Sequence, residues 1–308
     1  MAKTKVPVIN QSFGEHHAAY HADCVEGIKM LDADSIGYSI FSPPFSSLYT
    51  YSASDRDMGN CKDDAEFFEH FAFLIRDLYR VIQPGRLVSI HCMQMPTLKS
   101  RDGYLGIKDF RGDIIRAFQK EGFIFHPEVC IWKDPVTQMQ RTKSIGLLHK
   151  QIVKDSCVSR QGLADYLVTM RKPGENKNPV SGEFERWVGD ESFKSNGRLS
   201  IDVWQRYASP VWMDINPSDT LQFRSAREHA DERHICPLQL QVIERGLELW
   251  SNPGDVVLSP FMGIGSEGYV SIEADRKFIG FELKESYFRQ AIANLAHAES
   301  KKKEMMLL

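Results

Sequence analysis

The hydrophobic and polar positions along this chain predict buried strands that alternate with amphipathic helices. Four short apolar runs are rich in β-branched and aromatic residues, which is typical of strands covered on both faces. They occupy residues 35–41, 86–91, 256–259 and 277–281. Apolar side chains also recur at helical spacing, at Phe67, Phe71, Leu74, Leu78 and Ile82. This alternation predicts an α/β fold with a doubly wound, mostly parallel sheet.

The first of these strands ends abruptly in Ser42, Pro43, Pro44 and Phe45. Neither proline can donate a ladder hydrogen bond, so the chain must turn there with a rigid geometry. Open α/β sheets bind their ligands at the carboxyl ends of the strands. The turn therefore presents a hydroxyl, free carbonyls and an aromatic ring where a ligand is expected. A plain structural turn is the alternative interpretation of these four residues alone.

A second stretch, far downstream, favours the functional interpretation. Residues 253–266 contain a turn, a strand, a glycine loop with Gly263 and Gly265, and the start of a helix. The next strand, 277–281, ends in Glu282. Glycines allow close approach of the backbone to a ligand, and a carboxylate after the following strand can accept hydrogen bonds from ribose hydroxyls.

Together, the two stretches resemble the motifs of the DNA amino-methyltransferases, which are Ser/Asp-Pro-Pro-Tyr/Phe and Phe-x-Gly-x-Gly. Here the Ser-Pro-Pro-Phe motif comes first, which resembles the circularly permuted beta arrangement of that family. The resemblance covers most of residues 18–135 and 213–297. It implies a Rossmann-like methyltransferase fold, with an antiparallel pair of strands, 123–133 and 163–172, at the sheet edge.

The resemblance implies S-adenosylmethionine as methyl donor and the exocyclic amino nitrogen of a flipped DNA base as acceptor. Ser42 and the Pro43 carbonyl would accept the two amino hydrogens, Pro44 would fix the turn, and Phe45 would stack on the base. The expected cofactor-binding residues are Asp23, Pro260, Phe261, Gly263, Gly265, Ser266 and Glu282. The family often has Asp where this chain has Ser259, which removes one charge near the cofactor.

Three segments follow from this interpretation. Residues 1–135 form the catalytic half, with a polar, loosely held entry at 1–17, and residues 213–308 form the cofactor-binding half. Residues 136–212 between them hold a basic loop, an edge strand and an aromatic-rich target-recognition insert. From 133 to 177 there are nine Lys or Arg against four Asp or Glu. The candidate DNA-binding side chains in this region are Arg141, Lys143, Lys150, Lys154 and Arg160.

Composition adds constraints rather than a function. The chain has 308 residues, 42% hydrophobic residues and a net charge of −3, so any DNA-binding surface must be local. Its six cysteines are scattered, which predicts reduced thiols, no metal site and a cytoplasmic protein. No apolar run is long enough to span a membrane. His91 and Cys92 end a predicted strand, where they face either the ligand cleft or the core.

Several alternatives remain at this stage. Serine in the first motif slightly favours N4-cytosine over N6-adenine, and serine itself accepts through neutral lone pairs with either base. Gly263, Gly265 and Gly268 also fit the Gly-x-Gly-x-x-Gly spacing of a nicotinamide-dependent oxidoreductase. A non-catalytic DNA-binding protein with a decayed fold and a methyltransferase of RNA or protein are further alternatives. The expected partners are DNA and either a cognate restriction enzyme or none.

The motif assignment predicts that the two functions separate by mutation. Ser42→Ala or Phe45→Ala should abolish methyl transfer and leave S-adenosylmethionine affinity near normal, because both side chains are assigned to the base. Methyl incorporation and cofactor binding, measured on the same preparations, check this. Loss of both properties in a folded variant would show that the catalytic corner is misplaced.

Overall fold

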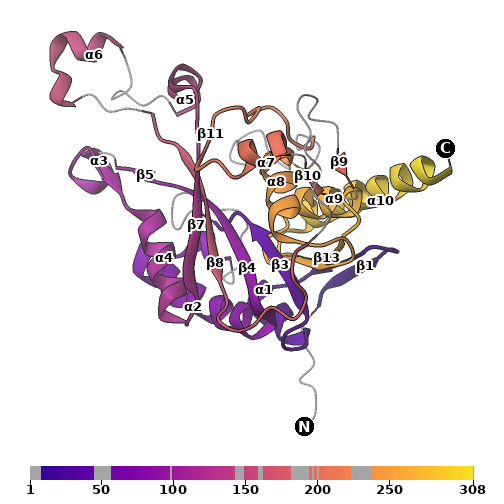
Figure 1. Cartoon of the computed structure of the whole chain (residues 1–308). Coiled ribbons are helices and arrows are strands. Elements are labelled where there is room, and N and C mark those ends of the chain that lie inside the picture. The colour runs from indigo at the N-terminus through magenta and orange to yellow at the C-terminus, as the bar shows by residue number, and fades with distance from the viewer. Residues whose placement is uncertain are drawn as a thin grey trace.

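A nine-stranded sheet forms the centre of the computed structural model (Figure 1). The structure describes residues 8–44, 57–97, 99–142, 149–158, 162–181, 194–195, 198–199, 201–222, 226 and 237–307. The strands, in their order across the sheet, are β1 (Asn10–Phe13), β2 (His17–His21), β13 (Lys277–Glu282), β12 (Val256–Ser259), β3 (Ile36–Phe41), β4 (Ile82–Met93), β8 (Asp165–Arg171), β7 (Ile124–Ile131) and β11 (Val211–Trp212). Only β1 and β8 run against the other strands. The predicted doubly wound, mostly parallel α/β fold is confirmed.

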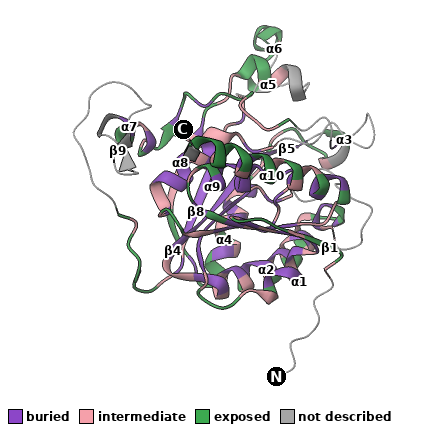
Figure 2. Cartoon of the chain, turned by 90° about the vertical axis from the view of Figure 1, so that its right-hand side faces the viewer, coloured by how far each residue is buried: buried purple, intermediate pink, exposed green. Residues whose placement is uncertain are grey.

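Helices cover both faces of this sheet, as Figure 2 shows from the side. On one face lie α1 (Cys24–Gly27), α2 (Asp64–Val81) and α4 (Phe110–Lys120), whose apolar side chains share one core cluster. On the other lie α8 (Leu240–Trp250), α9 (Ser266–Glu273) and α10 (Glu285–Leu307), whose apolar side chains share a second cluster. Each strand between the layers is therefore buried on two sides.

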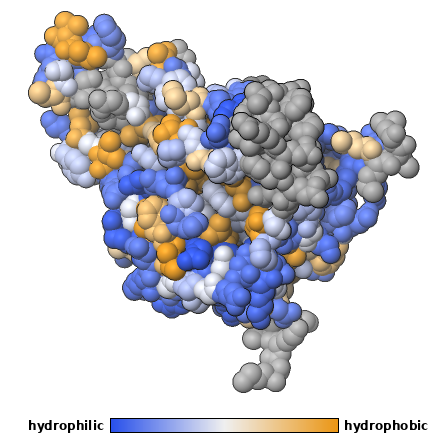
Figure 3. All heavy atoms as spheres, viewed as in Figure 1, coloured by the Kyte–Doolittle hydropathy of each residue, from blue (hydrophilic) through white to orange (hydrophobic). Residues whose placement is uncertain are grey.

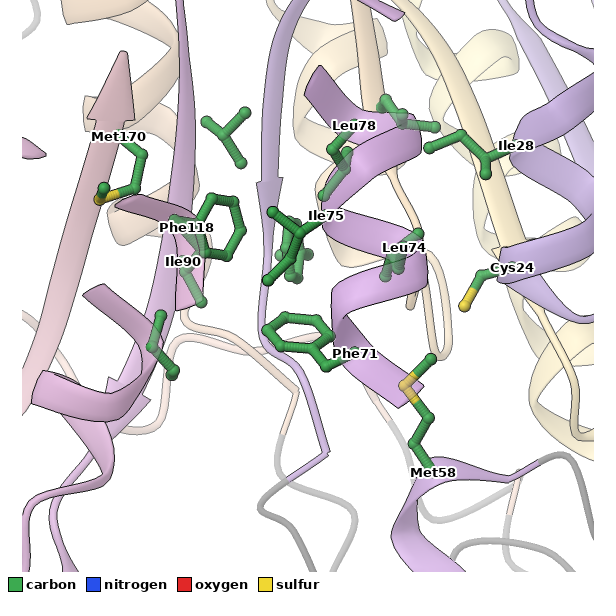
Figure 4. Close-up of a cluster of buried hydrophobic side chains, with 14 of the residues drawn as sticks. Cys24, Ile28, Met58, Phe71, Leu74, Ile75, Leu78, Ile90, Phe118 and Met170 are labelled. Carbon is green, nitrogen blue, oxygen red and sulfur yellow. The ribbon is translucent and has the colours of Figure 1, made fainter. Parts of the chain in front are cut away.

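Helix α2 carries the apolar stripe that the sequence predicts. Asp63 caps its first turn by accepting a hydrogen bond from the Glu66 backbone N–H at 3.0 Å. Phe71, Leu74 and Leu78 are fully buried against the sheet and α4 (Figure 4). Burial of such side chains is the main favourable term in folding, so α2 anchors this half of the sheet.

Arg86 ties the opposite ends of three strands together. Its guanidinium is 1% exposed, donates to the Gly37 carbonyl at 2.7 Å and forms an ion pair with Asp255. Gly37 lies in β3, Arg86 in β4, and Asp255 immediately precedes β12. A buried charge is tolerated because both ionic and carbonyl partners are present.

Two elements differ from the sequence-based expectation. Residues 10–21 do not form a loose entry but a β-hairpin, whose second strand pairs with β13. His17 and His21 are buried there because His17 pairs with Glu299 at 2.9 Å and the His21 ring contacts the Leu283 carbonyl at 2.9 Å. Partners far along the chain satisfy these polar side chains, so local polarity gave no sign of burial.

The predicted antiparallel pair β7 and β8 is present, yet it is not the edge of the sheet. β8 lies between β4 and β7, and β11 pairs with β7 on its outer side. Trp212 of β11 is 1% exposed, which explains why this short strand is retained. Strands from all three predicted segments therefore share one sheet.

The remaining elements are short. They are α3 (Lys99–Asp102), α5 (Pro135–Thr142), α6 (His149–Lys154), α7 (Ile201–Tyr207), the 3-10 turns η1 (Ile28–Met30), η3 (Met58–Asn60) and η5 (Ser156–Val158), and the strand pairs β5 (Met95–Pro96) with β6 (Ile107–Lys108) and β9 (Lys194–Ser195) with β10 (Arg198–Leu199). Helices α5 and α6 project from the body as an arm (Figure 1). Within the described part of the chain, no helix combines the length and apolar character needed to cross a bilayer.

The core assignment predicts a large stability difference between two phenylalanines of α2. Phe71→Ala should lower the free energy of unfolding by about 3–5 kcal/mol, because it leaves a cavity under the sheet. Phe73→Ala, on the half-exposed face of the same helix, should cost about 1 kcal/mol or less. Urea denaturation measures both, and equal losses would contradict this packing.

Candidate active site

Ser42 lies immediately after β3, at the carboxyl end of a strand that is buried along its whole length. Its side chain is half-buried, and the Pro43 ring behind it is buried. Two consecutive prolines fix the backbone, so the Ser42 hydroxyl has a defined position at the sheet edge. Pro44 is described with them, whereas Phe45 lies outside the described residues. The base-stacking role of Phe45 stays a prediction.

Three side chains that the sequence motifs do not include form a connected chain behind Ser42. The Ser42 Oγ lies 3.2 Å from the Nδ1 of His91, near the end of β4. The His91 Nε2 lies 3.0 Å from the Oδ2 of Asp165, the first residue of β8. Lys133, after β7, forms an ion pair with the same carboxylate oxygen. The end position of His91 on its strand was the only sequence signal for this cluster.

The charge on Asp165 is stabilised by its partners. Asp165 is 2% exposed, and burial by itself would raise the pKa of its carboxyl group. The charges and hydrogen bonds of His91 and Lys133 outweigh that effect, so the pKa of Asp165 is lowered from its ordinary value. Asp165 is therefore a carboxylate at neutral pH and accepts a hydrogen bond from the His91 Nε2–H.

This Ser-His-Asp arrangement lacks one part of a hydrolytic triad. In α/β-hydrolases, the residue after the nucleophile supplies a backbone N–H to the oxyanion. Here that residue is Pro43, which has no N–H. Ser42 is thus placed to accept and donate hydrogen bonds, without the local donor that acyl transfer needs.

The glycine loop between β12 and α9 has the backbone conformation expected of a binding loop. Gly263 and Gly265 have φ angles of 51° and 87°, in the left-handed region. A Cβ at Gly265 would meet Ala291 at 3.3 Å, so this position also needs the small residue for packing. A Cβ at Gly263 would meet no atom within 4 Å, so this face of the loop is open to a ligand.

Glu282 closes the loop from the end of β13. One carboxylate oxygen accepts from the Gly263 N–H at 3.0 Å and the other from the Lys284 N–H at 2.8 Å. Each oxygen keeps a second lone pair for a ligand hydroxyl. Burial raises the pKa of Glu282 to about 7, although both backbone N–H groups act in the opposite direction. Burial, assisted by the charge of Glu282, raises the pKa of nearby Glu267 to about 8.

The other expected cofactor residues surround the loop with varied accessibility. Pro260 and Ser266 are buried, and the half-buried Phe261 ring packs on Phe41 with ring centroids 5.7 Å apart. The hydroxyls of Ser259 and Ser266 are buried without a hydrogen-bond partner among the described residues. Unpartnered buried polar atoms beside an open glycine face fit a bound polar ligand. The residues present are therefore compatible with S-adenosylmethionine.

Asp23 follows β2 at the same edge of the sheet. Its carboxylate caps α1 by accepting from the Val25 N–H at 2.9 Å. The capping accounts for one of its oxygens and supports the predicted N-cap. Its minor role beside the cofactor stays a prediction.

The strand order brings all of these groups together. Going across the sheet, β13 ends at Glu282, β12 at the glycine loop and β3 at Ser42, while β4 presents His91 and β8 begins at Asp165. These five strands are direct neighbours, and all five positions lie at one edge. Polar loop and hydrogen-bond acceptor thus form two adjacent halves of one site.

The candidate DNA-binding residues are only partly described. Lys150 and Lys154 are exposed on α6, in the arm that follows β7 at this edge of the sheet. In Figure 3 the arm at the upper left carries both hydrophilic and hydrophobic surface. Arg141 lies in α5, but its side chain, like residues Lys143 and Arg160, lies outside the described part.

Comparison with known proteins identifies the family. A model of N6- and N4-acting DNA methylases matches residues 37–293, which is most of the chain. The chain belongs to this DNA methylase family. That membership confirms the family predicted from the two motifs and, with it, the class of enzyme and the cofactor that the family uses, S-adenosylmethionine.

Individual relatives agree with the family model. The chain is 36% identical over 107 residues to the DNA adenine methyltransferase YhdJ of Escherichia coli, a match that spans 34% of this chain and only 36% of that protein. It is 21% identical to the type II methyltransferase M.BglI of Bacillus subtilis, across 93% of this chain and 87% of that protein. One relative therefore matches over part of its length and the other over nearly all of it.

Solved structures show the same fold. The modification methylase TTHA0409 of Thermus thermophilus, solved with S-adenosyl-L-methionine, aligns with a TM-score of 0.64 at 20% identity, over 92% of this chain and 95% of that one. The cytosine-N4-specific PvuII DNA methyltransferase aligns with a TM-score of 0.64 at 14% identity, over 94% and 90%. The methyltransferase fold predicted from the motifs is thus confirmed.

The raised pKa of Glu282 predicts that cofactor binding depends on pH. Ribose hydroxyls donate to the ionised carboxylate, so binding must displace a proton wherever free Glu282 is protonated. Affinity for S-adenosylmethionine should be full above about pH 8 and fall as the pH decreases through 7, by up to about tenfold per unit. Titration calorimetry in buffers of different ionisation enthalpy measures both affinity and proton release.

Two isosteric variants provide the comparison. Glu282→Gln should weaken binding at pH 8 and flatten the pH dependence, because its side chain cannot ionise. Glu267→Gln removes the other buried carboxyl group and should leave the Glu282-linked proton release in place. An unchanged profile in Glu282→Gln would contradict the ribose assignment.

Proposed function

We propose that the protein transfers the methyl group of S-adenosylmethionine to the exocyclic amino nitrogen of a base flipped out of DNA. The observation that carries this proposal is the adjacency of two groups on neighbouring strands. The glycine loop with Glu282 follows β12 and β13, and the Ser42 acceptor follows β3. A donor on the loop and an amino group on Ser42 would meet at one sheet edge.

The catalytic corner has the acceptors that this reaction needs. An exocyclic amino nitrogen is a poor nucleophile, because its lone pair is delocalised into the ring. Ser42 Oγ and the Pro43 carbonyl can accept its two hydrogens and direct the lone pair away from the base plane. S-adenosylmethionine, when bound, supplies an electrophilic methyl group on sulfur. The protein then contributes mainly alignment and exclusion of water.

We propose that the arm and the 136–212 segment provide the DNA-binding surface. Lys150 and Lys154 are exposed at the same edge of the sheet as Ser42, where phosphates beside a flipped base would pass. Target recognition by the aromatic-rich part of this segment, and a cognate restriction enzyme, remain predictions. Cytosine N4 is placed slightly ahead of adenine N6 because Ser42 offers a neutral acceptor.

Nucleoside analysis tests the reaction itself. The protein is incubated with S-adenosylmethionine carrying a labelled methyl group and with unmethylated genomic DNA, and the digested nucleosides are analysed by mass. Labelled N4-methylcytosine supports the whole proposal, and N6-methyladenine keeps the reaction but reverses the base. Labelled RNA or protein with unlabelled DNA would overturn the proposed substrate.

Charge reversal tests the arm. Lys150→Glu with Lys154→Glu should weaken DNA binding and reduce the slope of log affinity against log salt by about 2, because two phosphate contacts are lost. The matched control is Lys120→Glu with Lys177→Glu. Lys120 ends α4 before β7, and Lys177 is close to Asn178, whose carbonyl accepts from Arg86, so both lie toward the opposite edge of the sheet.

Fluorescence anisotropy on a labelled duplex at several salt concentrations measures both double variants. The control pair should keep the wild-type salt slope, although it carries the same change in net charge. Equal losses in the two pairs would show that net charge, and not the arm, determines DNA binding.

A further inference from the structure

His91 is a buried histidine that the motifs of the site do not include. Its side chain bridges Ser42, through Nδ1 at 3.2 Å, and Asp165, through Nε2 at 3.0 Å. We infer that His91 is a positioning residue that orients the Ser42 hydroxyl and receives, through it, the proton released by the methylated amino group. The inference rests on the function proposed above and assigns the proton's destination.

The bond to Asp165 determines the tautomer of His91. Asp165 is held as a carboxylate by its partners and can only accept, so the neutral ring carries its proton on Nε2. Nδ1 is then an acceptor, and the Ser42 O–H is its donor. The alternative acceptor for this hydroxyl, the His91 backbone carbonyl, is more distant at 3.4 Å.

A hydroxyl that donates to His91 directs its lone pairs elsewhere. The Ser42 Oγ can then accept a hydrogen from the exocyclic amino group without changing its own donor bond. If His91 were doubly protonated, Nδ1 would donate to Ser42 and occupy one of those lone pairs. Neutral His91 therefore prepares Ser42 for the substrate.

The same connection provides a route for the proton after transfer. The nitrogen forms its bond to the methyl carbon as the sulfur–carbon bond breaks, and that bonding pair stays on sulfur. The nitrogen, now positively charged, loses a proton to Ser42 Oγ as the hydroxyl proton passes to His91 Nδ1. The product is a neutral methylated amine, and Asp165 stabilises the resulting imidazolium.

The charges around His91 set how strongly it holds that proton. Asp165 on β8 contacts the ring directly, and Lys133 after β7 partly neutralises that carboxylate. On β3 the only contacting group among the described residues is the uncharged Ser42. The neighbouring Cys92 points to the opposite face of β4, and it is Cys92 that the charges of Arg111 and Glu128 affect.

Two substitutions separate orientation from proton uptake. His91→Asn places an amide oxygen near the Nδ1 position, so it can orient Ser42 but cannot take up a proton. His91→Ala removes both properties. The matched control is His126→Gln, on an exposed histidine of β7 that makes no contact with Ser42 among the described residues.

Single-turnover methylation is measured from pH 5 to 8, the range in which a histidine changes charge. Wild type and His126→Gln should lose rate at the acidic end. His91→Asn should be slower and lack that acidic limb, and His91→Ala should lose about 100-fold or more at neutral pH, the lower end of the range for a positioned proton acceptor. Cofactor affinity should stay within twofold in both His91 variants.

Side-chain ¹⁵N NMR of the cofactor-free protein provides a readout that does not need turnover. The His91 signals should show the Nε2–H tautomer at pH 8, and Asp165→Asn should change the tautomer ratio. An Nδ1–H tautomer, or an acidic limb that survives in His91→Asn, would overturn the inference while leaving the proposed function intact. A wild type that binds S-adenosylmethionine but methylates no DNA would instead overturn the proposed function.

Discussion

The site depends on one constraint, the parallel alignment of β13, β12, β3 and β4. Parallel strands end at the same side of a sheet, so whatever follows each strand is brought into a single row. Here that row contains a carboxylate, a glycine loop, a serine and a histidine. The helices on both faces supply the burial that holds this alignment.

The same constraint explains why a permuted chain can build this site. The serine motif and the glycine loop lie more than two hundred positions apart in the sequence, yet β3 and β12 are hydrogen-bonded neighbours. Register pairs Val257 with Tyr38 and Leu258 with Ser39, which places Ser259 and Ser42 near each other at the edge. Chain order therefore matters less than strand order.

Local sequence predicted the parts of the site that are local in nature. The corner after β3 follows from two prolines, and the loop before α9 follows from glycines at positive φ. The hairpin at residues 10–21 could not be predicted this way, because His17 needs Glu299 from the far end of the chain. The partnership of His91, Asp165 and Lys133 likewise depends on the register of three strands, which no single stretch encodes.

The most direct measurement is a crystal structure of the protein with S-adenosylhomocysteine and a DNA duplex. The account predicts that the ribose hydroxyls lie on Glu282, the glycine loop faces the sulfur, and the exocyclic amino nitrogen of an extruded base lies within hydrogen-bond distance of Ser42 Oγ and the Pro43 carbonyl. A ribose bound away from Glu282, or a base held away from Ser42, would contradict the claim that these two motifs form the two halves of one active site.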